Sequence, residues 1–152
     1  MKNFTYAFIF LFAIVGCRSE LPNKGHTYCP KQELIINPHL VPYLNAFVDD
    51  CEKRGINPDH PFCLNWIKTF TNTHHTFQGQ TCFDDSTILI YEPLLEDSIG
   101  TKFVLYHELG HWYGLGHSDG IMKENYNSDD TEWVKENWDV LLEDYFDKLK
   151  NQ

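Results

Sequence analysis

Basic residues are scarce in this 152-residue chain. Twelve lysines and arginines stand against 22 aspartates and glutamates, which gives a formal net charge of −10 at pH 7. Proteins that bind DNA or RNA need clustered positive charge to displace the counterions of the phosphates, so the balance argues against nucleic acid as a partner. Ten acidic and two basic residues lie between Asp119 and Asp147. We interpret them as a solvated face, with a calcium site or a preference for basic substrates as alternatives.

The chain also lacks an apolar run long enough to cross a membrane. A spanning helix needs ~20 apolar residues, whereas the longest run, from Phe4 to Val15, has about a dozen. It follows a positively charged start, and residues 14–17 read Ile-Val-Gly-Cys, which is typical of a signal peptide. The pattern resembles the signal of a bacterial lipoprotein. The resemblance implies a lipid on Cys17 and a location in the bacterial cell envelope, with ordinary secretion or an uncleaved anchor as alternatives.

Internal repeats and low-complexity tracts are absent as well. We expect a signal peptide over 1–16, a lipidated N-terminus and short tether over 17–31, and one domain over 32–152. We expect a domain of roughly 120 residues to bury a core and to leave no room in this sequence for a separate inhibitory or recruiting module.

Cysteine is sparse, with five residues in the chain. Once Cys17 is set aside, an even number remains, and an exported protein of this size favours two disulfides. The three possible connectivities are not separable from sequence, and reduced buried thiols are the alternative. The candidates are Cys29, Cys51, Cys63 and Cys82.

The stretch 107–117 reads His-Glu-Leu-Gly-His-Trp-Tyr-Gly-Leu-Gly-His. Residues four apart on a helix share one face, so His107 and His111 can direct ring nitrogens at one metal ion about 2.0–2.1 Å away. On a continuous helix at ~100° per residue, His117 would point away from that ion. Gly114 permits the positive φ that ends a helix, after which His117 can return as the third ligand. The fourth position then stays open for water, as in catalytic zinc sites.

Glu108 lies ~100° around the helix from His107, off the ligand face but within reach of a metal-bound water. Zinc lowers the pKa of such a water to about 7, and a carboxylate can take its proton and pass it to a leaving amine. The motif therefore predicts a zinc endopeptidase with Glu108 as general base. The short H-E-x-x-H pattern is a weak signal, but its extension through Gly114 and His117 is a strong one. Structural zinc sites usually have four protein ligands, which disfavours that interpretation.

The sequence resembles the metzincin clan of zinc peptidases, and its matrixin-like members most closely. The defining positions of the extended motif are all matched, by His107, Glu108, His111, Gly114 and His117. The clan carries a methionine in a turn beneath the zinc, and the resemblance assigns this role to Met122, with core filling as the alternative. Some members place a tyrosine two residues after the methionine. Here that position is Glu124, and the nearest tyrosine is Tyr126.

The resemblance and the hydrophobic pattern predict an α+β domain. We expect a small mixed sheet, an N-terminal helix, a zinc-binding helix and a C-terminal helix. The elements are a helix from Pro38 to Gly55, strands over 63–70, 76–83 and 87–91, the zinc helix over 99–113 with Ser98 as N-cap, and a last helix from Asp129 with Glu132 completing a capping box.

In metzincins, a strand just before the zinc helix forms the edge of the sheet and pairs with an extended substrate. The resemblance assigns this role to residues 87–91, centred on Ile88, Leu89 and Ile90; an ordinary half-buried strand is the alternative. Main-chain pairing tolerates varied side chains. The expected partner is therefore a protein or peptide substrate, and we expect a monomer.

Two other functions are consistent with parts of the sequence. A thermolysin-like peptidase would take its third ligand from Glu132 or Glu136, which leaves Gly114 and His117 unexplained. A non-catalytic surface-binding protein on a peptidase fold would have lost the base or a ligand, and all of them are present here.

Overall fold

The computed structural model describes residues 34–58, 64–71, 77–124 and 126–151. The chain is α+β, as predicted, and none of the helices in these ranges is long and apolar enough to cross a membrane. In chain order the elements, with η for a short 3-10 helix, are β1 (Ile35–Ile36), η1 (Pro38–Leu40), α1 (Val41–Lys53), β2 (Trp66–Phe70), β3 (Gly79–Cys82), β4 (Thr87–Tyr91), η2 (Glu92–Glu96), α2 (Ser98–Trp112), η3 (Gly120–Met122), η4 (Ser128–Asp130), α3 (Thr131–Glu136) and α4 (Trp138–Lys150).

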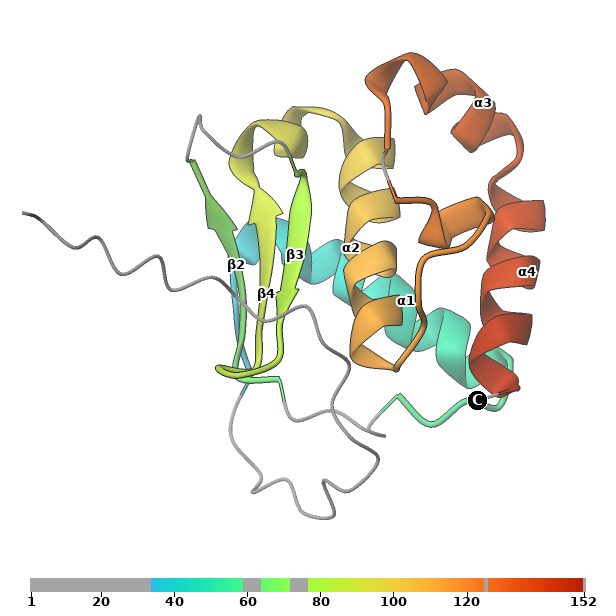
Figure 1. The fold of residues 1–152 in the computed structure, drawn as a ribbon, viewed down its shortest axis with the longest axis horizontal. Helices are drawn as coiled ribbons and strands as arrows, with labels where there is room; N and C mark the ends of the chain where they lie inside the picture. Colours follow the sequence, from blue (N-terminus) through green and yellow to red (C-terminus); the bar gives the residue numbers. More distant parts are fainter. Residues whose placement is uncertain (1–33, 59–63, 72–76, 125, 152) are drawn as a thin grey trace, which may run out of the picture.

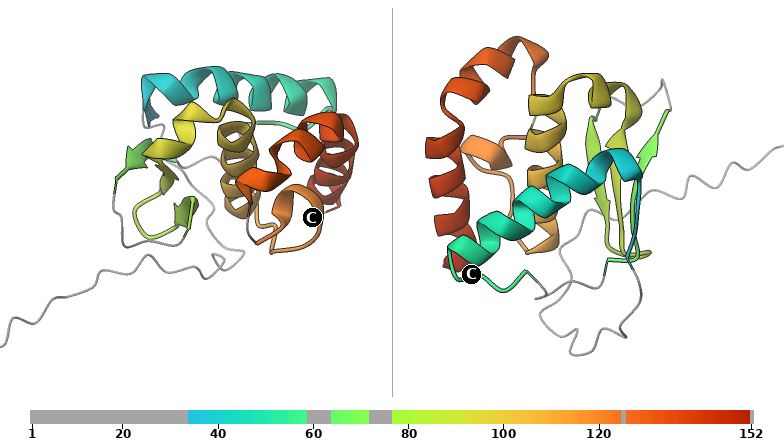
Figure 2. Two further views of the ribbon diagram at one scale, coloured as in Figure 1. Left: turned by 90° about the horizontal axis from the view of Figure 1, so that it is seen from above. Right: turned by 180° about the vertical axis from the view of Figure 1, so that it is seen from behind.

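Helix α2 lies at the centre of the molecule. The sheet is on one side of it and α4 on the other (Figure 1). The views from above and behind show α1 running along the back of α2 (Figure 2). All-round contact explains why α2 is buried along nearly its whole length, including the polar side chains of His107 and Glu108. The segment with the histidine motif is therefore the core helix of the domain.

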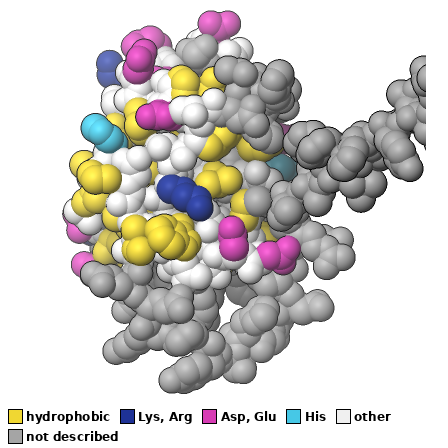
Figure 3. All heavy atoms as spheres, turned by 90° about the vertical axis from the view of Figure 1, so that its left-hand side faces the viewer, with side chains coloured by type: hydrophobic (Ala, Val, Ile, Leu, Met, Phe, Trp, Pro, Cys, Tyr) yellow, Lys and Arg dark blue, Asp and Glu magenta, His cyan; other side chains and the backbone are white. Residues whose placement is uncertain are grey.

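The four strands form one mixed sheet in the order β1-β2-β4-β3. β1, β2 and β4 are parallel, and β3 runs antiparallel to β4 at the edge beside α2. On the face of the sheet that is turned away from α2, Ile35 and Trp66 are exposed. Lys68 Nζ lies 5.5 Å from the centre of the Trp66 ring. The space-filling view of this side shows apolar side chains gathered around basic ones (Figure 3).

The prediction that residues 87–91 form the edge strand is wrong. This segment is β4, which pairs with β2 on one side and β3 on the other. Ile88 and Ile90 have no exposed surface, and Leu89 is half-buried. A near-continuous apolar run is typical of a strand covered by neighbours rather than of an edge. Among the strands that the structure describes, the open edge next to α2 belongs to β3.

The helix predicted from Pro38 begins as the single turn η1 and continues as α1 until Gly55, at φ +69°, ends it. The apolar spacing places Phe47 on the buried face. Its ring centre lies 5.1 Å from that of Tyr106 on α2 and 5.9 Å from that of Phe146 on α4. This aromatic cluster joins three helices and fixes α2 against the back of the domain.

Cys51 corrects the expectation of two disulfides. It is a free thiol with no exposed surface, and burial raises its pKa to about 12. Helical spacing directs it into the core, where a thiol packs as a small apolar side chain, and an even cysteine count does not reveal this. Cys82 is disulfide-bonded. Its partner lies outside the described residues, as do Cys17, Cys29 and Cys63.

The single C-terminal helix predicted from Asp129 is in fact broken at Asn137 into α3 and α4. The Asn137 side chain donates to the carbonyl of Trp133 at 2.8 Å, and such side-chain bonds compete with the helical ladder. The capping box with Glu132 does not form, since no side chain caps α3. The two helices nevertheless bury apolar side chains, those of Val134, Leu141, Leu142, Tyr145 and Leu149.

Asp97, and not the predicted Ser98, is the N-cap of α2. Its Oδ1 accepts the backbone N–H groups two and three residues further on, at 3.1 and 3.0 Å. Its Oδ2 accepts the hydroxyls of Tyr126 and Thr131, at 2.8 and 3.1 Å. Burial raises the pKa of this carboxyl, but the four hydrogen bonds outweigh burial and hold the pKa below its usual value. One carboxylate thus ties the start of α2 to the segment that follows η3.

We expect Asp97→Ala to lower the free energy of unfolding by about 2–4 kcal/mol, because a lost cap costs ~1 kcal/mol and the orphaned hydroxyls cost more. A lowered folded-state pKa means that the carboxylate stabilises above its unfolded pKa of about 3.9, and that this contribution disappears as pH falls through the folded value. The difference between wild type and variant should therefore shrink in acid. Urea unfolding at several pH values measures it. Ser98 is exposed, and the free energy of unfolding of Ser98→Ala should stay within ~0.5 kcal/mol of wild type. A larger loss would show that Ser98 is the N-cap of α2.

Candidate metal centre

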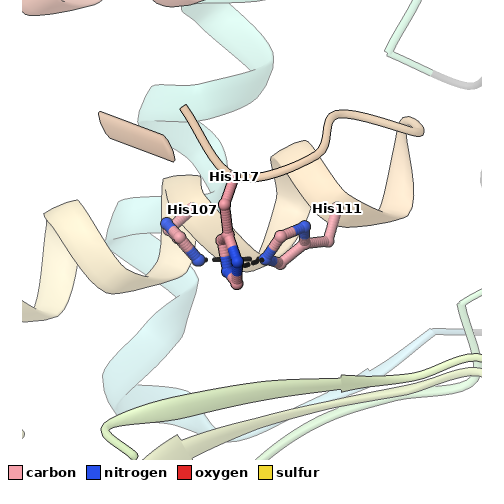
Figure 4. A group of neighbouring side chains, drawn as sticks. All are labelled: His107, His111 and His117. Carbon is pink, nitrogen blue, oxygen red and sulfur yellow. Dashed lines mark hydrogen bonds between the residues drawn. The ribbon is translucent and has the colours of Figure 1, made fainter. Parts of the chain in front are cut away.

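Three histidine rings converge beside the sheet (Figure 4). His107 and His111 lie one turn apart on α2, and His117 returns from the loop after it. Nε2 of His111 is 2.9 Å from Nε2 of His107 and 3.1 Å from Nε2 of His117. Each ring offers a ligand atom, and these atoms lie within 4.8 Å of one another, close enough to bind one metal ion.

The return of His117 depends on Gly114. This glycine has φ +96°, which L side chains rarely adopt, and its N–H donates to the His111 carbonyl at 2.9 Å. The chain reverses there, and Ser118 N–H then donates to the Met122 carbonyl at 2.9 Å, which closes the loop that carries His117. The spacing of the motif predicts this reversal, and the structure contains it.

The second ring nitrogen of each helical histidine defines its tautomer. His107 Nδ1 lies 2.8 Å from the Ile121 carbonyl, and His111 Nδ1 lies 2.8 Å from the Leu115 carbonyl. A carbonyl oxygen only accepts, so each Nδ1 carries the proton and each Nε2 presents a lone pair. Two lone pairs at 2.9 Å repel each other. A cation bound by both relieves that repulsion, and carbonyl partners of this type orient metal ligands in known sites.

The environment also keeps these rings neutral. Burial lowers the pKa of His107 to about 4, a shift that the Ile121 carbonyl opposes and the neighbouring histidines reinforce. Burial likewise lowers the pKa of His111, with the same opposing effect from its carbonyl partner. An imidazole must be neutral to bind a metal. At pH 7 neither ring needs to lose a proton first.

Glu108 points from α2 toward β3. The residue is only 4 % exposed, and burial raises its pKa to about 7 even though hydrogen bonds from Thr81 act in the opposite direction. The Thr81 hydroxyl lies 2.8 Å from Oε2. A Cβ on Gly79 would lie 2.6 Å from Oε1, so the absent side chain makes room for the carboxylate. Sequence reasoning missed both β3 residues, although their i, i+2 spacing places them on one face of the strand.

Met122 packs against the inner side of α2. It is 1 % exposed and lies in η3, and a Cβ added to Gly110 would collide with its sulfur. The preceding carbonyl, of Ile121, is the one that holds His107. The turn that contains Met122 therefore contacts α2 and also orients His107, one of the three candidate ligands.

The centre opens into a cleft of about 630 Å³. One wall is β3, and the other is formed by residues on both sides of η3, among them His117 and Lys123. Tyr126 lines the cleft, but its hydroxyl bonds to Asp97 and Thr131 and so is held in the wall. The chemistry gathered here is a set of three imidazoles, a buried carboxylate and an adjacent strand edge. This combination suits a Lewis-acidic metal that works with a proton acceptor on an extended ligand.

The alternative ligands do not join the cluster. Within the described ranges, the three histidines are the only group of metal-ligating side chains close enough to share an ion. Glu132 and Glu136, on α3, are exposed and outside it. The acidic residues from 119 to 147 likewise form no such group, so the calcium alternative gains no support from these residues.

No protein-family profile, curated protein or solved structure matches this chain.

Proposed function

We propose that the protein is a zinc-dependent endopeptidase of the metzincin type. The observation that carries the proposal is the convergence of two Nε2 lone pairs and a third imidazole beside the buried carboxylate of Glu108. Three imidazole ligands, with no carboxylate or thiolate among them, suit zinc in a site that keeps a coordination position open. Met122 in a turn against α2 further supports the resemblance to the clan.

Glu108 is the proposed general base and transfers the proton. When bound, zinc supplies a Lewis acid that polarises the scissile carbonyl and acidifies water. As water adds to the carbonyl carbon, Oε1 of Glu108 accepts its proton; when the C–N bond breaks, the same oxygen returns that proton to the leaving nitrogen. Oε1 suits this task because it makes no hydrogen bond to the described residues, whereas Oε2 is engaged by Thr81.

The substrate strand pairs with β3. Tyr91 N–H donates to the Gln78 carbonyl at 2.8 Å, which makes this a hydrogen-bonded pair of the antiparallel ladder. Such pairs alternate with pairs whose backbone groups point away. The N–H and C=O groups of Gly79 and Thr81 therefore face the open edge, beside the histidines. An extended peptide that adds there gains main-chain hydrogen bonds whatever its side chains.

Digestion of casein and of a peptide library by the purified protein tests this proposal. We expect cleavage with one equivalent of zinc, loss of cleavage with a chelator, and recovery when zinc is returned. The specificity constant should rise with peptide length, because each added residue contributes bonds to β3. A zinc-loaded protein that cleaves neither substrate would instead favour the surface-binding alternative.

We also propose that the protein is anchored to a bacterial membrane through a lipid on Cys17. Residues 1–33 lie outside the described ranges, so the lipoprotein-like pattern at 14–17 carries this proposal alone. Mass spectrometry of the N-terminal peptide would show the lipid, and an unmodified Cys17 would contradict it.

A further inference from the structure

We infer that Thr81 is a positioning residue for the proposed general base: its hydroxyl holds one oxygen of the Glu108 carboxylate so that the other takes the proton. The inference rests on the proposed function and adds a residue that no part of the metal-binding motif contains. It begins from a side chain of β3, that of Thr81, which hydrogen-bonds to α2.

The contact between Thr81 and Glu108 is short and buried away from solvent. Thr81 Oγ1 lies 2.8 Å from Oε2 of Glu108 and 2.9 Å from the Glu108 carbonyl oxygen, and the residues are 6 % and 4 % exposed. A hydroxyl has one proton to donate, and both neighbours are acceptors, so the proton is shared between them. Hydrogen bonds to a charged group away from water are among the stronger ones in proteins. The threonine thus links the carboxylate to the backbone of its own helix.

This bond distinguishes the two carboxylate oxygens. Oε2 is occupied by Thr81, and Oε1 is left without a hydrogen-bond partner among the described residues. Gly79 keeps the space around Oε1 open, because a Cβ there would lie 2.6 Å from it. Without the hydroxyl, the flexible glutamate side chain would have no partner in the site to hold one orientation. A base that is misplaced by about 1 Å can cost ~100-fold in rate.

The same residues of β3 therefore contact the proposed base and bind the proposed substrate. The Thr81 hydroxyl contacts Glu108, and Gly79 leaves room for the carboxylate because it has no side chain. The backbone groups of both residues face the open edge where the proposed substrate binds. A peptide that orders this strand also orders the contact to the base. Binding energy from the substrate main chain is then used for catalytic geometry, which raises kcat rather than lowering KM.

Three variants separate positioning from packing. Thr81→Val keeps the shape and removes the hydroxyl, Thr81→Ser keeps the hydroxyl and removes a methyl group, and Thr87→Val is the matched control. Thr87 is another buried threonine, on β4, whose hydroxyl lies 3.3 Å from the Asp85 carbonyl and away from the cleft. Each zinc-loaded protein is assayed for kcat, KM and metal content, and its crystal structure is determined.

For Thr81→Val we expect kcat to fall ~10- to 100-fold with KM within about 3-fold of wild type. Zinc content should be unchanged, and the Glu108 carboxylate should leave its place beside β3. Thr81→Ser should restore both the rate and the carboxylate position, and Thr87→Val should match wild type. If Thr81→Val does not fold, Thr81→Ala carries the same expectations, with Thr81→Ser as its rescue.

The outcomes separate the two proposals. If wild type cleaves peptides and Thr81→Val equals it in kcat with the carboxylate unmoved, the positioning role is overturned and the proposed function stands. If no variant cleaves any peptide but the carboxylate shifts only when the hydroxyl is lost, the positioning role stands and the proposed function falls. A Thr81→Ser variant as impaired as Thr81→Val would assign the effect to packing and overturn the inference.

Discussion

Glu108→Gln should keep its zinc and its fold and lose peptide cleavage by ~10⁴-fold or more. An amide is nearly the same size as a carboxylate but accepts no proton at neutral pH. General-base assistance is typically a 10²–10⁴-fold effect, and here one group would serve both proton transfers. The amide oxygen can still accept the Thr81 hydroxyl, so the contact between α2 and β3 survives.

The same variant should be at least as stable as wild type in its metal-free form above pH 7. Burial raises the pKa of Glu108 to about 7, which means that the folded protein disfavours the ionised carboxylate. This cost grows as pH rises from the unfolded pKa toward the folded one, and glutamine removes it. Urea unfolding measures this stability, casein digestion measures the loss of activity, and metal analysis measures the zinc content.

Glu92→Gln, at an exposed position outside the cleft, is the control and should cleave normally. A zinc-loaded Glu108→Gln with near wild-type turnover would remove Glu108 as the base.

His117→Ala should weaken zinc binding by more than the ~10–100-fold that loss of an outer-shell partner costs, because it deletes a ligand outright. The ring is exposed, so its removal leaves the core intact, and the metal-free variant should unfold within ~0.5 kcal/mol of wild type. Zinc should therefore raise the melting temperature of wild type much more than that of the variant. Competition titration against a chelator gives the affinity directly.

Glu132→Gln and Glu136→Gln are the matched controls for this titration. Both residues were sequence-level candidates for the third ligand, and both lie outside the histidine cluster. Their zinc affinity should equal that of wild type. A loss of affinity in either glutamine variant, with His117→Ala unaffected, would move the third ligand to α3 and favour the thermolysin-like alternative.

The predictable parts of the site are those with local causes. One helical turn separates His107 from His111 in any α-helix, and the positive φ of Gly114 reverses the chain within three residues. His117 and Met122 follow in one short loop, closed by a single backbone bond from Ser118. Because the contacts among these residues span at most 15 positions, their spacing in the sequence already contains most of the geometry.

Predictions that needed long-range information failed. The strand 87–91 was correctly placed in the chain, but its position within the sheet depends on where residues 66–70 and 79–82 pair, and no pattern inside the strand specifies that. The even cysteine count favours a disulfide at Cys51, whereas packing of α1 against the core leaves it as a buried thiol. At the N-cap of α2, the local pattern also misses that Oδ2 of Asp97 accepts two distant hydroxyls, those of Tyr126 and Thr131.

The sequence by itself determined the candidate metal ligands, the candidate base and the reversal at Gly114, since helix periodicity and glycine stereochemistry act over a few residues. Only the tertiary structure decided what surrounds the base. Thr81 and Gly79 are 27 and 29 residues from Glu108 in the chain, and the antiparallel pairing of β3 brings them against it. Strand order is a property of the whole sheet, set by which apolar surfaces can be buried together. The strand edge, the carboxylate orientation and the raised pKa of Glu108 therefore arise from the fold.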